Sequence, residues 1–299
     1  MGLDGLAAPL LTMFAPDGEL DLGRNAAFAR NISEAGVDHL FVLGSTGEFP
    51  SVTPRERGPL IEVVVESATG RTDVWAGCGA PSTAQAVAFA QEAEEMGVDA
   101  LVAVPPYYLH PSVTGIDHYY RAIATAVKLP VLAYNNPSLV GYALPPTLIH
   151  RLAKDGVVAG IKDSGGTIES VNGFLTGAPK GFAVLPGDPP LATPAILRGA
   201  RGAVMGVSNV VPRLCVALVH AALRGDWAQA AELQPVVDEL VAVVKVGPSP
   251  STFKFLTAYL RGTDVGYRAP YEPLTADEEK AVLERLAPLR PRLVPYLAK

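Results

Sequence analysis

Short apolar runs recur along the chain and alternate with segments in which apolar residues are spaced three and four positions apart. The runs lie at Leu6–Phe14, His39–Leu43, Asp73–Cys78, Ala100–Val104, Pro130–Tyr134, Val158–Ile161, Phe182–Leu185 and Gly202–Val207. The intervening segments, of which Ala84–Glu94 is an example, have the spacing of amphipathic helices, and many end in a glycine just before the next run. The pattern therefore predicts a strand followed by a helix, repeated eight times.

Eight strand–helix units favour an α/β fold of one kind, the (β/α)8 TIM barrel, over an open doubly wound sheet. The strands of a parallel barrel are buried on both faces, which agrees with runs that are almost continuously Val, Ile, Leu and Ala. We expect the barrel to occupy residues 1–224 and to carry the active site. Further amphipathic patterns at Asp226–Val246, Ser251–Arg261 and Thr275–Leu289 predict a C-terminal helical extension over residues 225–299.

Composition and charge narrow the range of partners to small molecules. The 299 residues carry a formal net charge of −6 and the basic residues form no stripe, so we expect no nucleic acid partner. No run of about 18 apolar residues occurs and the first residues lack the features of a signal peptide, so we expect no membrane segment and a cytoplasmic location. Cys78 and Cys215 are interpreted as reduced core residues, and the histidines lack metal-ligand spacing, so no metal site is expected.

Lys162 ends one of the predicted strands, in the apolar run that begins at Val157. Removing an ammonium group from water disfavours its charged form, and an amine that is neutral near pH 7 is a nucleophile that forms Schiff bases with ketones. From this segment alone a structural interpretation also fits, in which the aliphatic stem packs on the core and the ammonium reaches solvent at the strand end. The motifs elsewhere in the chain bear on this choice.

Unusual residues collect after the other predicted strands as well. The motifs are Gly44-Ser45-Thr46-Gly47-Glu48, Pro105-Pro106-Tyr107-Tyr108, Tyr134-Asn135-Asn136-Pro137 and Pro186-Gly187-Asp188. In a TIM barrel all of them lie on the rim that carries active sites, because the C-terminal ends of the strands share one end of the barrel. Each motif has a structural explanation of its own, as a tight turn or as rim packing, but their convergence on one rim favours Lys162 as a nucleophile.

Three of these motifs resemble a known superfamily. In order and spacing, Gly44-Ser45-Thr46-Gly47-Glu48, Tyr134-Asn135-x-Pro137 and Gly160-Ile161-Lys162-Asp163 are similar to those of the dihydrodipicolinate synthase and N-acetylneuraminate lyase superfamily. Its members are class I, Schiff-base-forming aldolases. The resemblance covers essentially the whole chain and implies a TIM barrel with a C-terminal helical extension, assembled as a homotetramer (a dimer of dimers). A protonated imine is itself an electron sink, so no cofactor is expected.

The resemblance implies a role for each matching residue. Lys162 would attack the ketone of pyruvate or of a 2-keto acid, and Tyr134 would pass protons to and from the carbinolamine and the aldol oxygen. Ser45 and Thr46 would bind the pyruvate carboxylate, with one hydroxyl joining the proton relay. Tyr108 resembles a relay tyrosine that reaches in from a neighbouring subunit. Two further residues are expected to line the substrate site, the second through its main-chain carbonyl: Gly187 and Val204.

Departures from the superfamily pattern concern the substrate. Leu139 stands where dihydrodipicolinate synthases carry an arginine that grips a second carboxylate, and an aliphatic side chain offers no bidentate fork. Pro189 and Pro190 stand where sialic-acid lyases carry residues that hold sugar hydroxyls, and Gly206 replaces their serine. These departures leave a pyruvate lyase for another aldehyde. The segment Ile161-Lys162-Asp163-Ser164 resembles members that cleave a 2-keto-3-deoxy or 4-hydroxy-2-oxo acid to pyruvate and an aldehyde. The hydroxyls of that acid are expected to meet one or more of three residues: Asp188, Ser208 and Asn209.

Three alternatives remain open from the sequence. A dihydrodipicolinate synthase-type condensation of pyruvate with an aldehyde and the dehydration of a keto-deoxy acid use the same Schiff base. Outside enzymes, the chain could be a sensor that retains a keto-acid pocket without turnover.

Overall fold

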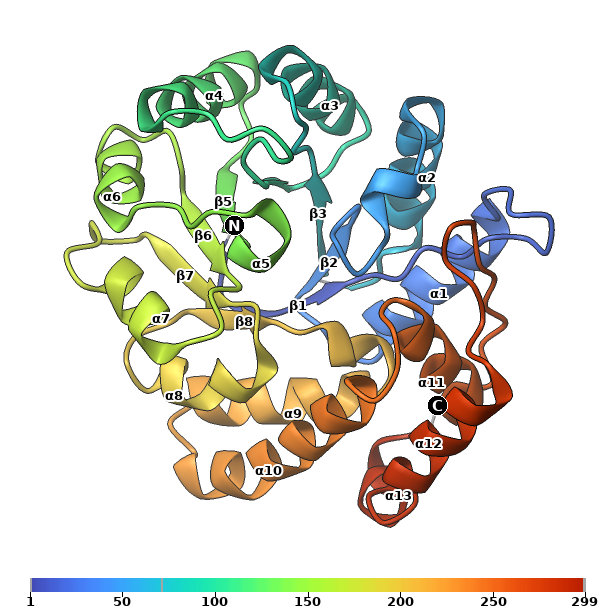
Figure 1. The fold of residues 1–299 in the computed structure, drawn as a ribbon. Helices are drawn as coiled ribbons and strands as arrows, with labels where there is room; N and C mark the ends of the chain where they lie inside the picture. Colours follow the sequence, from blue (N-terminus) through green and yellow to red (C-terminus); the bar gives the residue numbers. More distant parts are fainter. Residues whose placement is uncertain (1, 71, 298–299) are drawn as a thin grey trace.

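The eight predicted strands form one parallel sheet that closes into a barrel (Figure 1). The computed structural model describes residues 2–70 and 72–297. The strands are β1 (Gly5–Pro9), β2 (His39–Val42), β3 (Asp73–Gly77), β4 (Ala100–Ala103), β5 (Val131–Asn135), β6 (Gly160–Asp163), β7 (Ala183–Pro186) and β8 (Gly202–Val204). Consecutive strands pair from β1 to β7, and β8 pairs with β1. The backbone N–H of Arg201 completes the closure by donating to the carbonyl of Val184 on β7 at 3.1 Å. The predicted (β/α)8 barrel is confirmed.

Helices connect the strands and surround the barrel (Figure 1). They are α1 (Leu22–Glu34), α2 (Pro54–Ser67), α3 (Thr83–Glu95), α4 (Val113–Ala126), α6 (Pro146–Lys154), α7 (Ile168–Leu175), α8 (Ala192–Ile196) and α9 (Pro212–Leu223). Shorter elements lie in the loops that follow strands: α5 (Pro137–Val140), η1 (Phe49–Ser51), η2 (Pro189–Leu191) and η3 (Gly206–Asn209). The loops that carry the predicted motifs therefore gather at one end of the barrel.

The strands bury side chains on both of their faces. Phe41, Trp75, Leu132 and Leu185 belong to a cluster that fills the inside of the barrel. The alternate residues of the same strands point outward and pack against the helices. This double burial explains why the strands read as continuous apolar runs. The predicted core positions of the two cysteines are also confirmed, since both are free and buried.

The first strand is shorter than predicted. The apolar run Leu6–Phe14 is buried throughout, yet β1 ends at Pro9. Beyond Pro9 the backbone is satisfied partly by side chains, as where the N–H of Leu11 donates to Oδ1 of Asn209 at 3.0 Å. A buried loop held by amide side chains has the same apolar pattern as a buried strand, so hydropathy alone does not distinguish the two.

The C-terminal extension is helical, as predicted. It consists of α10 (Trp227–Val244), α11 (Ser251–Arg261), α12 (Ala276–Leu286), α13 (Arg290–Leu293) and η4 (Val294–Tyr296). These elements, orange to red in Figure 1, lie outside the barrel, and α10 packs against α9. Helix α11 contacts η3 at the end of the barrel where the motifs gather. The division of the chain at residue 224 stays a prediction, and its outer limits, residues 1 and 299, lie outside the described residues.

Candidate active site

Lys162 lies inside the barrel with only 5% of its surface exposed. Its register partner on the neighbouring strand β5 is Tyr134. Partners on adjacent parallel strands project from the same face of the sheet, so backbone pairing itself brings the two side chains together. The Nζ atom lies 4.1 Å from the centroid of the Tyr134 ring and 5.1 Å from that of Phe41. The amine is thus enclosed by aromatic rings instead of extending into solvent.

The phenol of Tyr134 is held by polar neighbours from two loops. Its hydroxyl accepts a hydrogen bond from Nδ2 of Asn136 at 2.9 Å and lies 3.4 Å from Oγ of Ser45. Burial by itself would raise the pKa of Tyr134, but the nearby charge of Lys162, with hydrogen bonding to Ser45, Ser164 and Lys162, lowers this pKa below its ordinary value. A phenol with a lowered pKa and a hydroxyl neighbour is suited to moving protons.

The next residue on each strand faces the other way. Asn135 and Asp163 are register partners, and Nδ2 of Asn135 donates to Oδ1 of Asp163 at 2.7 Å. Oδ1 of Asn135 in turn accepts from the N–H of Leu144 at 2.9 Å. Because strand residues alternate in direction, this pair lies outside the barrel and away from the amine. Asn135 and Asp163 therefore hold the two strands in register. The inward pair, Tyr134 and Lys162, contains the candidate catalytic groups.

Gly187 lies beside the side chain of Lys162, and Val204 lies inside the barrel. A Cβ atom at Gly187 would lie 2.2 Å from Oγ of Ser164 and 3.1 Å from Cε of Lys162, so any side chain there would displace both groups. Val204 is buried in the cluster inside the barrel. The missing side chain at Gly187 lets Ser164 and Lys162 pack close to the backbone, while the substrate-binding role of Gly187 stays a prediction.

The turn Gly44–Glu48 presents donors to a cavity at this end of the barrel. The cavity has a volume of about 480 Å³, and Ser45 and Thr46 lie in its wall with Tyr107 and Leu139. Among the described residues, no backbone carbonyl accepts from the N–H groups of Ser45 and Thr46. Unpaired N–H groups beside two hydroxyls form a suitable site for a carboxylate.

Tyr108 lies apart from the residues described so far. Its side chain is 90% exposed, and its backbone has a φ of 73°, in the left-handed region that residues other than glycine rarely adopt. Its neighbour Tyr107 lines the cavity of its own chain, whereas Tyr108 does not. With so much of its surface exposed, Tyr108 extends into solvent in the single chain. The structure does not bring Tyr108 together with the other predicted site residues of the same chain.

The expectation that Asn209 meets a substrate hydroxyl is wrong. Its side chain is fully buried, and Nδ2 donates to the carbonyls of Pro9 and Gly206, each at 2.8 Å. Ser208 is equally buried and donates to the carbonyl of Met205 at 2.6 Å. Both residues hold the loop that follows β8, so of the three predicted hydroxyl ligands only Asp188 stays a candidate.

Two features of the site escaped sequence reasoning. Asn136 occupies the variable position of the Tyr134 motif, and only the structure shows that its amide reaches the phenol. Lys254 on α11 is fully buried against Glu48, with 2.6 Å between Nζ and Oε1. The residues around Lys254 have the spacing of an ordinary amphipathic helix. Their pattern therefore does not indicate that Lys254 pairs with Glu48, which is far away in the sequence.

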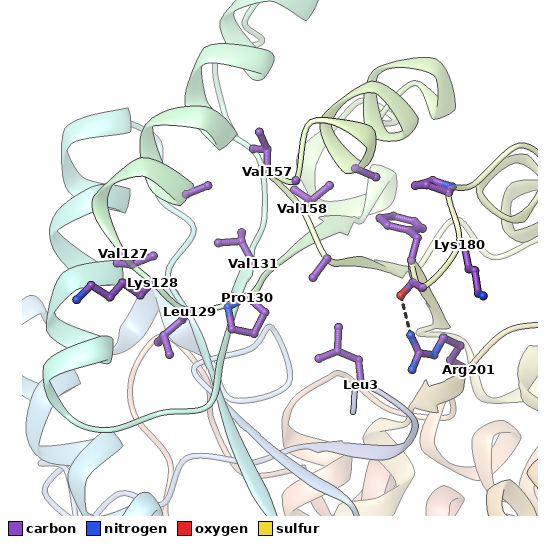
Figure 2. Close-up of a pocket in the computed structure, with 17 residues that line it drawn as sticks. Leu3, Val127, Lys128, Leu129, Pro130, Val131, Val157, Val158, Lys180 and Arg201 are labelled. Carbon is purple, nitrogen blue, oxygen red and sulfur yellow. Dashed lines mark hydrogen bonds between the residues drawn. The ribbon is translucent and has the colours of Figure 1, made fainter. Parts of the chain in front are cut away.

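A second cavity, of about 560 Å³, opens at the opposite end of the barrel (Figure 2). It lies at the N-terminal ends of the strands, where Lys128 and Lys180 stand on opposite sides. Its third cation, Arg201, donates to the carbonyl of Gly181 at 2.7 Å and pairs with Asp4. Active sites of TIM barrels lie at the other end. None of the predicted site residues lines this cavity, so it is not our candidate.

The fold and the chemistry at the C-terminal ends of the strands define a class of protein, the Schiff-base-forming lyases built on a (β/α)8 barrel. Known proteins place the chain within that class. The family model of the dihydrodipicolinate synthetase family matches residues 2–288. An uncharacterized DapA-like lyase of Halobacterium salinarum is 37% identical over 97% of this chain and 95% of its own length. A 4-hydroxy-tetrahydrodipicolinate synthase of Acidobacterium capsulatum is 35% identical over 96% of this chain and 95% of its own length.

Solved structures agree with these relatives. The 4-hydroxy-tetrahydrodipicolinate synthase of Methylacidiphilum fumariolicum SolV superposes with a TM-score of 0.92 at 30% identity, covering 98% of each chain. YagE, an E. coli K12 prophage protein of the dihydrodipicolinic acid synthase family solved in complex with pyruvate, superposes with a TM-score of 0.90 at 28% identity, covering 96% of this chain and 99% of YagE. The chain belongs to the dihydrodipicolinate synthetase family and is a carbon–carbon lyase of the pyruvate-dependent, class I aldolase type. Among its described helices, none is both long enough and apolar enough to cross a bilayer.

Proposed function

We propose that this protein reversibly cleaves a 2-keto-3-deoxy or 4-hydroxy-2-oxo acid to pyruvate and an aldehyde, with Lys162 as the nucleophile. The observation that carries the proposal is the enclosed amine of Lys162, 4.1 Å from the ring of Tyr134, whose hydroxyl contacts Ser45 and Asn136. The pyruvate complex of YagE supports a 2-keto acid as the ligand of this fold.

The proposed reaction proceeds through an imine. The lone pair of the Lys162 Nζ atom adds to the ketone carbon of the substrate, and Tyr134 donates the proton that lets the hydroxyl of the carbinolamine leave as water. In the protonated imine, Tyr134 accepts the proton of the C4 hydroxyl, the C3–C4 bond breaks, and its electron pair moves into the iminium to give an enamine and an aldehyde. Protonation of the enamine and hydrolysis of the imine release pyruvate and restore Lys162. The imine is the electron sink, so we propose that no cofactor takes part.

The cavity wall bears on the aldehyde part of the substrate. Leu139 lies in this wall on α5, and among the described residues no arginine or lysine lines the same cavity. A carboxylate on the aldehyde partner would therefore lack a cation to hold it. This favours an aldehyde without a second carboxylate. A dihydrodipicolinate synthase-type condensation stays the second candidate, because the relative from Acidobacterium capsulatum bears that activity in its name.

We expect a clear preference in a panel of substrates. Cleavage of a 2-keto-3-deoxy acid should have a higher kcat/KM than either sialic-acid cleavage or the condensation of pyruvate with aspartate semialdehyde. A missing charge-assisted hydrogen bond costs about 1.5 to 3 kcal/mol, or about one to two orders of magnitude in binding. The measurement is release of pyruvate, or its consumption in the condensation, in a coupled assay. If condensation is the fastest reaction, the argument from Leu139 is wrong. If the substrate loses water and no pyruvate is released, the enzyme is a dehydratase. If no substrate is turned over, the protein is a sensor.

A matched variant sharpens this test. Leu139→Arg should raise kcat/KM for aspartate semialdehyde by about tenfold or more, because it supplies the missing fork at the cavity wall. The same variant should not improve cleavage of an uncharged 2-keto-3-deoxy chain.

We also propose that the active unit contains at least two chains and that the full assembly is a homotetramer. Tyr108 is exposed and does not line its own cavity. Leu109 and Val113, close to it in the sequence, and Leu139, in the cavity wall, are exposed apolar side chains. A second copy of the chain would cover these residues and receive Tyr108 in its own site.

Subunit mixing tests the shared site. Tyr108→Phe and Lys162→Ala should each be nearly inactive, but co-expression of the two should restore about a quarter of the wild-type activity if chains pair at random. Activity returns because a chain with Lys162 intact receives Tyr108 from a partner that lacks only Lys162. Light scattering of the wild type should show an oligomer. A fully active monomer, or no restoration on mixing, would remove Tyr108 from the shared site. The expected cytoplasmic location stays a prediction.

A further inference from the structure

Lys254 is a buried lysine that the proposed reaction does not use. It lies on α11, in the C-terminal extension, and none of its surface is exposed. Its Nζ atom is 2.6 Å from Oε1 of Glu48, donates to the carbonyl of Gly266 at 2.7 Å and lies 4.7 Å from the centroid of the Phe14 ring. One ammonium thus joins the extension, the loop after β1 and the loop after β2. A group with its polar contacts occupied in this way is an anchor and not a nucleophile.

Glu48 is the last residue of the turn Gly44–Glu48. Its φ of 56° is in the left-handed region, where a residue with a side chain needs outside support. Two hydrogen bonds of 3.1 Å close the turn, from the N–H of Gly47 to the carbonyl of Gly44 and from the N–H of Glu48 to the carbonyl of Ser45. The Oε2 atom of Glu48 has no hydrogen-bond partner among the described residues. The support that its side chain receives is therefore electrostatic, mainly from the charge of Lys254 and to a lesser degree from that of Arg268.

The charged states of Glu48 and Lys254 depend on each other. Burial raises the pKa of Glu48 and lowers the pKa of Lys254, and the opposite charge of each residue counters the shift of the other. If Glu48 is removed, Lys254 is left as a buried cation that the charge of Arg268 also disfavours, and it either loses its charge or moves toward water. If Lys254 is removed, Glu48 keeps only the weaker attraction of Arg268, and it likewise loses its charge or moves. Movement of Glu48 would carry along Ser45 and Thr46, because they belong to the same closed turn.

We propose that Lys254 is a positioning residue, whose ion pair with Glu48 holds the N–H groups and hydroxyls of Ser45 and Thr46 toward the carboxylate of the bound 2-keto acid. The inference rests on the proposed function, since it assigns the carboxylate to this turn. It gives the C-terminal extension a part in substrate selection, because the anchor lies outside the barrel. Loss of the anchor should weaken recognition of the carboxylate and leave the amine of Lys162 able to react.

The test compares two ketones that differ in the carboxylate. Pyruvate and acetone both form an imine with a lysine, and borohydride fixes each imine for mass analysis, but acetone has a methyl group in place of the carboxylate. For Lys254→Met, the pyruvate concentration that gives half-maximal labelling should rise by about tenfold or more, because charge-assisted hydrogen bonds are misaligned. The acetone concentration that gives half-maximal labelling should change by less than about twofold, because acetone has no carboxylate for the turn to bind.

Glu48→Gln and Glu56→Gln form a matched pair of variants. Glu56 on α2 also pairs with a cation that follows α11, at 2.6 Å from Nη2 of Arg268, but it does not belong to the turn. Both variants remove a carboxylate from a buried or half-buried ion pair and should lower Tm. Only Glu48→Gln should raise the pyruvate concentration that gives half-maximal labelling. If Lys254→Met does not fold, the double variant Glu48→Gln/Lys254→Met, which leaves no unpaired charge, takes its place.

The outcomes separate this inference from the proposed function. If the wild type forms no pyruvate adduct, the proposed function fails. If the wild type is labelled but the variants lose pyruvate and acetone labelling in equal proportion, or keep their preference for pyruvate, Lys254 is merely structural and the inference is overturned. A selective loss for pyruvate that Glu56→Gln does not share supports it.

Discussion

Lys162→Ala should abolish borohydride-dependent labelling by pyruvate and lower kcat by about 10⁴-fold or more, because the imine that carries the reaction no longer forms. In the wild type, reduction with pyruvate should add one pyruvyl-derived mass, and peptide mapping should place it at Lys162. The enclosure of the amine by the rings of Tyr134 and Phe41 is the physical reason to expect one site of labelling.

Lys128→Ala is the control for that experiment. Lys128 lies at the cavity on the opposite end of the barrel and should be neither labelled nor needed for turnover. Labelling at Lys128, Lys154 or Lys180 with Lys162 unmodified would contradict the assignment of the nucleophile. Labelling at Lys254 would contradict its role as an anchor.

Tyr134→Phe should lower kcat by about 10²-fold or more and leave the fold intact, since general acid–base catalysis contributes about 10²- to 10⁴-fold. The variant removes only the hydroxyl that contacts Ser45 and Asn136. The phenol takes part in imine formation and in bond cleavage, so steady-state kinetics and the rate of pyruvate labelling should both fall. The thermal midpoint should remain near that of the wild type.

Tyr120→Phe provides the comparison. Tyr120 is fully buried, and its hydroxyl donates to the carbonyl of Ala103 at 3.0 Å. Its removal should cost about 1 kcal/mol of stability without changing kcat. If Tyr134→Phe turns over its natural substrate as fast as the wild type, the proton relay must be assigned to another group.

The candidate catalytic pair, Lys162 and Tyr134, could be predicted from the sequence for a physical reason. Each residue ends an apolar run, and in a parallel barrel the ends of such runs meet at one rim, so position along the chain translates into position in space. The same rule failed for Asn209, because the rim position of a residue does not determine whether its amide points into the cavity or holds the backbone of a loop.

The contacts that depend on tertiary structure were not predictable in this way. Asn136 reaches the phenol only because the chain turns into α5 at Pro137. Lys254 and Glu48 lie far apart in the sequence, and the charge of each is compensated only when α11 is packed on the barrel. Hydropathy describes burial of a single position, whereas an ion pair requires two positions to be known together.

The register pairing of Tyr134 with Lys162 separates the reaction from the choice of substrate. The geometry of these two groups is set by backbone hydrogen bonds between β5 and β6, while Leu139 and Tyr107, in the cavity wall, lie on loops that no strand constrains. Loop residues can therefore be exchanged without disturbing the imine-forming pair. For protein engineering, this makes the cavity wall the place for libraries that seek new aldehyde partners, with the two strands kept unchanged.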